Sequence, residues 1–166
     1  DVSGNIYTTG NFEATVDFDP GEGVANLTST GSYDIFVQKL DTDGNFIWAK
    51  HMGGNNYDQG RAIVVNASGN IYITGMFYGT ADFNPDSETA NLTSAGGYDI
   101  FIQKLDTNGN FLWVKQIGGV KWDQGQSVAA DASGNVYTTG YFNGTADFDP
   151  GVGTENLSSI GSADIF

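Results

Sequence analysis

The feature that most constrains the fold of this chain is an internal repeat with a period of 65 residues. Gly4-Asn5-Ile6-Tyr7 returns as Gly69-Asn70-Ile71-Tyr72 and again as Gly134-Asn135-Val136-Tyr137. Aligning residues 1–65 with residues 66–130 gives 37 identical positions. A period of this length is typical of solenoids, propellers and other arrays, in which each unit buries its faces against its neighbours.

Each period predicts four β-strands and no helix. In the complete unit, segments rich in Ile, Val, Phe, Tyr, Trp and Thr predict strands at 61–65, 70–77, 99–105 and 110–117. Turns of the pattern Asp/Asn-x-x-Gly-Asn join the first strand to the second and the third to the fourth. The first side chain of this pattern can cap the turn, and the glycine supplies a positive φ, so consecutive strands should be antiparallel.

A four-stranded antiparallel meander that repeats along a chain predicts the blades of a β-propeller. A parallel β-helix is the competing repeat fold, but its coils are shorter and need no tight hairpins. We therefore expect an all-β protein: one partial propeller over residues 1–166, with units 1–60, 61–125 and 126–166 and about two and a half blades. Because propellers have at least about four blades, we expect the chain to be a fragment whose partners include other blades of a longer chain.

Charge and composition exclude several classes of protein. The chain has 20 acidic and 6 basic residues and a formal net charge of −14, which disfavours binding to nucleic acid and to anionic membrane surfaces. Without cysteine it has no disulfides, no thiol catalysis and no cysteine-ligated metal. No apolar run approaches the roughly 18 residues of a membrane span, so we expect no membrane insertion.

The repeated motifs resemble a known family. The segments DASGNVYTTGYF (131–142) and DIFVQKLDTDGNFIWAKHMGG (34–54) resemble the SBBP repeat, a β-propeller repeat of many bacterial secreted and surface proteins. The pattern Leu40-Asp41…Gly44…Trp48 is also similar to the tryptophan-docking repeat of quinoprotein-type propellers. The resemblance implies a bacterial, extracellular or cell-surface scaffold. It identifies no site, and an insertion at 15–32 makes each unit longer than the usual repeat.

Loop aromatics are the candidate ligand contacts. Alternate loops of a meander fall on the same side, so we expect the tight turns on one face and the insertions with the inter-unit loops on the other. By analogy with propellers, the second face would bind a ligand. Exposed Tyr and Trp in such loops commonly anchor sugars and proteins. Those that change between units are Tyr57, Tyr78, Trp122 and Tyr141. The alternative interpretation is neutral drift of surface residues.

A second candidate site lies in the insertion, where acidic side chains recur in a loop rich in glycine and proline. Oxygen ligands with this spacing could contribute to a calcium site, although calcium takes six to eight of them. The alternative interpretation is an Asx-turn with a phenylalanine packed beneath it. The candidate ligands are Asp17, Asp19, Asp82, Asn84, Asp147 and Asp149.

These observations predict a non-enzymatic, extracellular or cell-surface propeller module for protein or glycan binding, adhesion or structural spacing, with no cofactor unless calcium binds. One alternative is a fragment of a propeller-scaffold enzyme, either quinoprotein or glycan-active. Such enzymes need clustered carboxylates, His or Arg, whereas His51 is the only histidine and Arg61 the only arginine. The other alternative is a calcium-stabilised structural array.

Overall fold

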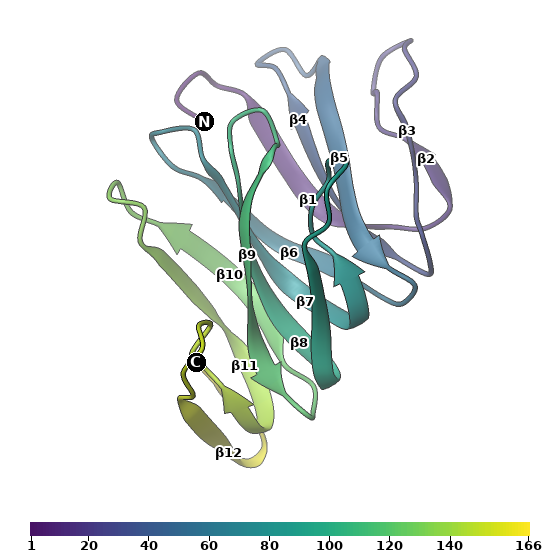
Figure 1. Ribbon diagram of the computed structural model, residues 1–166. Helices are drawn as coiled ribbons and strands as arrows, with labels where there is room; N and C mark the ends of the chain where they lie inside the picture. Colours follow the sequence, from purple (N-terminus) through teal and green to yellow (C-terminus); the bar gives the residue numbers. More distant parts are fainter.

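The computed structural model describes residues 1–166 as antiparallel β-strands joined by turns and loops (Figure 1). It confirms the prediction of an all-β protein, and it contains no helix long and apolar enough to cross a membrane. The strands are β1 (Ile6–Phe12), β2 (Thr15–Asp17), β3 (Asn26–Thr28), β4 (Asp34–Leu40), β5 (Phe46–Gly54), β6 (Gln59–Val65), β7 (Ile71–Asp82), β8 (Asn91–Leu105), β9 (Phe111–Gly119), β10 (Gln124–Ala130), β11 (Val136–Asp147) and β12 (Asn156–Ile165).

The middle repeat contains the four predicted strands in one antiparallel meander, β6-β7-β8-β9. The first repeat contributes β1, β4 and β5, and the third contributes β10, β11 and β12, paired in the same way. Figure 1 shows the three groups side by side in sequence order, from purple through green to yellow. The groups are joined at their ends, where β5 pairs with β7 and β9 pairs with β11 over two residues each.

The tight turns have the predicted geometry. In the turn between β4 and β5, Oδ1 of Asp41 accepts hydrogen bonds from the backbone N–H groups of Asp43 (2.9 Å) and Asn45 (2.8 Å). Gly44 takes the left-handed conformation, with φ of 84°. These bonds hold the pKa of Asp41 below its ordinary value, the side-chain and backbone bonds from Asn45 being the main cause. The local sequence therefore determines each hairpin without help from the rest of the fold.

The insertion differs from expectation in two respects. In the middle repeat it prolongs the meander, because β7 and β8 pair beyond a bulge, with Thr80 opposite Thr93 and Asp82 opposite Asn91. In the first repeat the corresponding strands form a separate two-stranded sheet, β2-β3, which stands apart from β1 and β4 in Figure 1.

The tip of the insertion does not lie with the inter-unit loops, as we expected it to. In the first repeat it folds back beside the tight turn between β4 and β5, and residues 19–23 line one cavity together with residues 44–46. The base of the insertion does lie as predicted: Gly31 packs so closely on Asn55 that a Cβ would come within 2.4 Å of its carbonyl carbon. The expected division of loops between two faces is therefore only half right.

Close contact between the repeats depends on glycine. β6 packs against β1, and β10 packs against β6 and β7. A Cβ at Gly60 would lie 2.2 Å from Oγ1 of Thr9, and one at Gly125 would lie 2.3 Å from Oγ1 of Thr74. The first strand of each following repeat can therefore lie directly on the second strand of the repeat before it.

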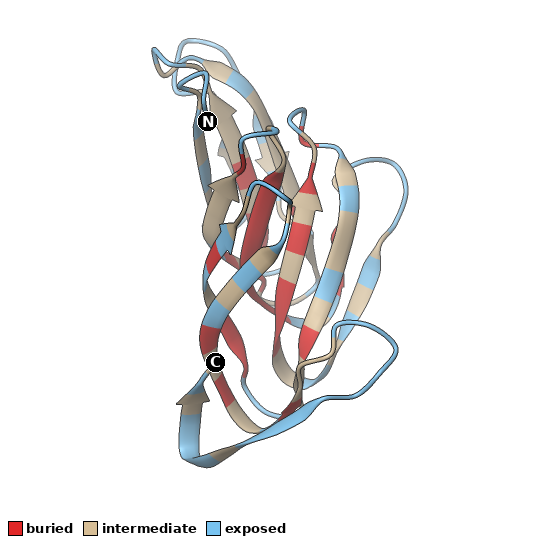
Figure 2. Cartoon of the chain, turned by 90° about the vertical axis from the view of Figure 1, so that its left-hand side faces the viewer, coloured by how far each residue is buried: buried red, intermediate tan, exposed pale blue.

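The main hydrophobic core lies between the first and middle repeats. It includes Ile35 and Val37 from β4 and Ile71, Ile73 and Phe77 from β7, all fully buried. Figure 2 shows the buried segments along these central strands, whereas the outer loops and the C-terminal hairpin are exposed. Burial on both sides explains why the strands are apolar on consecutive residues and do not alternate strictly.

Candidate functional site

A row of five aromatic side chains runs across the ends of the first two repeats. Tyr33 contacts Tyr57 with ring centroids 5.2 Å apart, and Tyr57 contacts Tyr98 at 6.1 Å. Tyr98 in turn contacts both Tyr78 and Trp122 at 5.4 Å. Tyr78 is 42% exposed and Trp122 is 51% exposed, while the other three rings are partly buried. We call this set the aromatic row.

A buried aspartate in each inter-unit loop fixes the row in place. The backbone N–H of Asp58 donates to the carbonyl oxygen of Tyr33 (2.9 Å), and Tyr33 and Tyr57 form an isolated parallel bridge. The carboxylate of Asp58 accepts bonds from the N–H groups of Gly54 (2.8 Å) and Tyr78 (3.1 Å). One side chain therefore joins three of the segments that carry the rings. The same bonds recur at Asp123, with Tyr98, Gly119 and Asn143.

The electrostatics of this region follow from its burial. Burial raises the pKa of Asp58 to about 6, against the opposing effect of its backbone hydrogen bonds, and the nearby charge of Asp34 raises it further. Burial also raises the pKa of Tyr98, to which Tyr57 and Asp58 contribute. The Tyr98 hydroxyl is therefore protonated at neutral pH, and its ring lies over an anionic carboxylate. A ligand would meet aromatic faces and phenol hydroxyls here.

The structure brings together three of the four aromatic residues that the sequence suggested. Tyr57, Tyr78 and Trp122 belong to the row, whereas Tyr141 lies in β11 with its hydroxyl 2.8 Å from the side-chain amide of Gln124. Sequence reasoning missed Tyr33 and Tyr98, since it considered only positions that differ between the first two repeats. A signal was available: the corresponding position of the third repeat is Ala163, which interrupts the tyrosine series.

The acidic residues of the insertion form Asx-turns. Oδ1 of Asp17 accepts bonds from the backbone N–H groups of Asp19 (3.0 Å) and Ala25 (2.8 Å) and so closes the loop at both ends. These two bonds, that from Ala25 above all, hold the pKa of Asp17 below its ordinary value. Phe18 is buried beneath the loop. The same arrangement recurs at Asp82 with Asn84 and at Asp147 with Asp149.

The candidate calcium ligands therefore have a structural role that needs no metal. The structure contains no group of three or more His, Cys, Asp or Glu side chains placed to hold a metal ion. Backbone N–H groups already bind one oxygen of each of the aspartates Asp17, Asp82 and Asp147. Calcium binding stays a prediction, which a chelator experiment can test.

Comparison with known proteins adds the family. Residues 112–149, which include β9, β10 and β11 as far as Asp147, match the family model of SBBP, described as a β-propeller repeat. The chain carries an SBBP repeat. Because the matched SBBP segment lies within the internal periodicity of the sequence, its counterparts stand one and two periods earlier.

Two relatives of known description extend over more of the chain than the SBBP repeat. An uncharacterized WD repeat-containing protein, L264, of Acanthamoeba polyphaga mimivirus is 30% identical over 139 residues, which are 74% of this chain. The regulatory protein FlaEY of Caulobacter vibrioides is 23% identical over 157 residues, which are 93% of this chain. The chain matches only 10% of the length of the first protein and 16% of the second.

Proposed function

We propose that the chain forms consecutive blades of a β-propeller, with one blade per 65-residue period and about two and a half blades present. The SBBP match and the complete meander β6-β7-β8-β9 support this arrangement. The packing of each following repeat on the one before it supports it as well, since propeller blades hide their faces in this way.

This propeller is a non-enzymatic module that binds protein or glycan at the surface of a bacterial cell or outside it, for adhesion or for spacing between other domains. The aromatic row is the observation that carries the proposal. Aromatic side chains supply large apolar contact areas at little cost in conformational entropy, and Tyr and Trp are the commonest anchors of binding surfaces. Here, two of the five rings are more than two-fifths exposed, and a buried aspartate holds the segments beneath them.

The experiment is to screen the fluorescently labelled chain against immobilised glycans and immobilised peptides, with variants that shorten the row. Trp122→Ala and Tyr78→Ala each remove an exposed ring, and we expect each to weaken binding by about ten-fold or more, since central aromatic anchors contribute about 2 kcal/mol. Tyr137→Ala is the matched control, because Tyr137 is 60% exposed and lies outside the row. The proposal is wrong if no surface binds the chain, or if the two row variants bind as well as the control does.

A further inference from the structure

A polar cavity of about 500 Å³ lies between the middle and third repeats. One wall comes from β9, the last strand of the middle repeat, and the other from the end of β11 and the loop that follows it. β9 and β11 pair here, with Gly118 opposite Asp147. The polar and glycine residues that line the cavity are Lys115, Gln116, Gly118, Asp147, Asp149 and Gly151.

A fully buried carboxyl group lies beneath one wall of this cavity. Oδ2 of Asp99 accepts bonds from the N–H of Ala95 (3.1 Å) and from Nε2 of Gln116 (2.5 Å), and both of these residues line the cavity. Oδ1 of Asp99 has no hydrogen-bond partner. Gly118 leaves open the space next to this atom, because a Cβ there would lie 2.7 Å from it. A buried acceptor without a partner is costly, so it favours a ligand that can donate to it.

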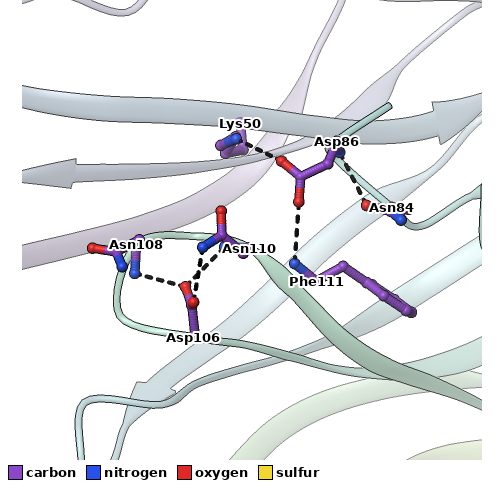
Figure 3. A network of polar contacts seen from close by, with 7 residues as sticks. All are labelled: Lys50, Asn84, Asp86, Asp106, Asn108, Asn110 and Phe111. Atoms are coloured by element: carbon purple, nitrogen blue, oxygen red, sulfur yellow. Dashed lines mark hydrogen bonds and ion pairs between the residues drawn. The ribbon is translucent and has the colours of Figure 1, made fainter. Parts of the chain in front are cut away.

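The equivalent place one repeat earlier shows what fills such a cavity. There the cavity measures about 220 Å³, and it is lined by Asp86. Figure 3 shows Asp86 between its partners: its Oδ1 forms a 3.0 Å ion pair with Nζ of Lys50, and its Oδ2 accepts from the N–H of Phe111 (3.4 Å). The residue that corresponds to Asp86 in the next loop is Gly151, and Lys115, which corresponds to Lys50, forms no ion pair.

The chemistry of the larger cavity is mixed. The ammonium group of Lys115 offers donors, whereas Asp99 Oδ1 and the second oxygens of Asp147 and Asp149, which accept no hydrogen bond, offer acceptors. A bare metal cation would face the like charge of Lys115, and the net charge of −14 disfavours an anion. Hydroxyl groups both donate and accept, so a neutral polyol satisfies both kinds of group.

We propose that this cavity binds one neutral saccharide residue, with Asp99, Asp149 and Lys115 as its polar contacts. The volume lies within the range of small-ligand sites, about 300 to 1,000 Å³. Leu92, Val114 and Pro150 add apolar surface for the C–H face of a sugar ring. The site shares no residue with the aromatic row, so it is a second binding site beyond the proposed function, and either can fail without the other.

The test is a titration of the isotope-labelled full chain with free D-glucose, D-galactose, D-mannose and N-acetylglucosamine, followed by NMR. We expect at least one sugar to shift the amide signals of Ala95, Gly118 and Gly151 in a saturable way, with a Kd in the millimolar range that a single small site supports, about −4 kcal/mol. The amides of the aromatic row should not shift with them.

Matched variants come from the chain itself. Asp149→Asn combined with Gly151→Asp writes the loop sequence Asn84-Pro85-Asp86 into the third repeat, so an aspartate can pair with Lys115 and fill the cavity. This double variant should lose the sugar-induced shifts. Asp86→Gly removes the partner of Lys50 and should create a second set of shifts around Thr30 and Gly53, which line the smaller cavity. Trp122→Ala should bind these sugars as the unmodified chain does.

Two outcomes would overturn the proposal. One is that none of the four sugars shifts the amides that line the cavity in the folded, unmodified chain. The other is that the shifts persist unchanged in the double variant while its spectrum shows that it is folded.

Discussion

Gln116 on β9 donates a 2.5 Å hydrogen bond from Nε2 to Oδ2 of Asp99 on β8, and this bond leaves the other carboxylate oxygen of a fully buried side chain without a partner. Burial raises the pKa of Asp99 to about 6, although the bonds from Ala95 and Gln116 lower it and the charge of Asp123 adds a smaller increase. At neutral pH the folded protein therefore holds an anion that its surroundings do not fully compensate.

We predict that Asp99→Asn stabilises the protein at neutral pH. The amide oxygen can take the place of Oδ2 and keep both hydrogen bonds, while the NH₂ group takes the place of the unpartnered Oδ1. Removing the buried charge should raise the free energy of unfolding at pH 7 by about 1 to 2 kcal/mol, as measured by urea titration. Asp58→Asn is the control, since both oxygens of Asp58 accept backbone N–H bonds and one of these would be lost.

The same substitution should change the pH dependence of stability. Because the pKa of Asp99 in the folded protein, about 6, lies above its ordinary value of 3.8, the folded state binds more protons between these values. Stability should therefore fall as the pH rises from about 4 to about 6, and the Asn variant should show a smaller fall. Equal slopes for the variant and the unmodified chain in this range would contradict the assignment.

The strands and turns followed from the sequence wherever the information is local. The turns with Gly44 and Gly109 have positive φ as predicted, and the four strands of the middle repeat lie where they were expected. The extension of β7 to Asp82 was not predicted, because pairs such as Thr80 with Thr93 join polar residues of low strand propensity. This pairing depends on a bulge at Gly79, which no short pattern reveals.

The candidate site was only partly readable from the sequence. Variation between repeats identified Trp122 and Tyr78, but it overlooked Tyr98, the ring that contacts both. Repetition of a residue does not exclude a surface role, since a row that crosses two repeats needs the same ring in each. The cavity above Asp99 was invisible, because it depends on the absence of a side chain at two positions, Gly118 and Gly151, on different repeats.

Ala14 has a backbone strain that its counterparts avoid. Its φ is 61°, a left-handed conformation that costs a residue with a Cβ about 1 kcal/mol, whereas the equivalent residues Gly79 and Gly144 adopt it freely. We predict that Ala14→Gly raises the free energy of unfolding by about 0.5 to 1 kcal/mol, contrary to the usual effect of glycine. The reciprocal variant Gly144→Ala should lower it by a similar amount. Urea unfolding of both proteins checks the pair, and a destabilised Ala14→Gly variant would refute the strain.

The role of the insertion loop can be separated from that of calcium. Asp147→Ala removes the acceptor of the N–H groups of Asp149 and Glu155, and it should lower the free energy of unfolding by about 1 to 2 kcal/mol in a chelating buffer. The calcium hypothesis adds that calcium raises the unfolding midpoint of the unmodified chain more than that of the variant. A midpoint that is the same in calcium and in chelator would show that these loops act without the metal.

The stacking of repeats predicts the effect of lengthening the chain. Tyr72 and Ile100 in the middle repeat are fully buried where β10 of the next repeat packs, whereas their counterparts Tyr137 and Ile165 are 60% and 85% exposed. Appending a copy of residues 102–166 after Phe166 supplies the strand that corresponds to β10. Burying these two side chains should raise the free energy of unfolding by at least about 2 kcal/mol, as measured by urea unfolding of the longer protein.

The control for this extension is the same construction with valine at the copied position of Gly125. In the chain itself, a Cβ at Gly125 would lie 2.3 Å from Oγ1 of Thr74 and 3.2 Å from Cγ2 of Ile100, so a larger side chain cannot sit at this contact without separating the two strands. The valine version should therefore lose most of the added stability and leave Tyr137 accessible to solvent, as reported by its fluorescence quenching. Equal stability of the two extended proteins would mean that successive repeats do not pack through this glycine, and the radial stacking of blades would have to be abandoned.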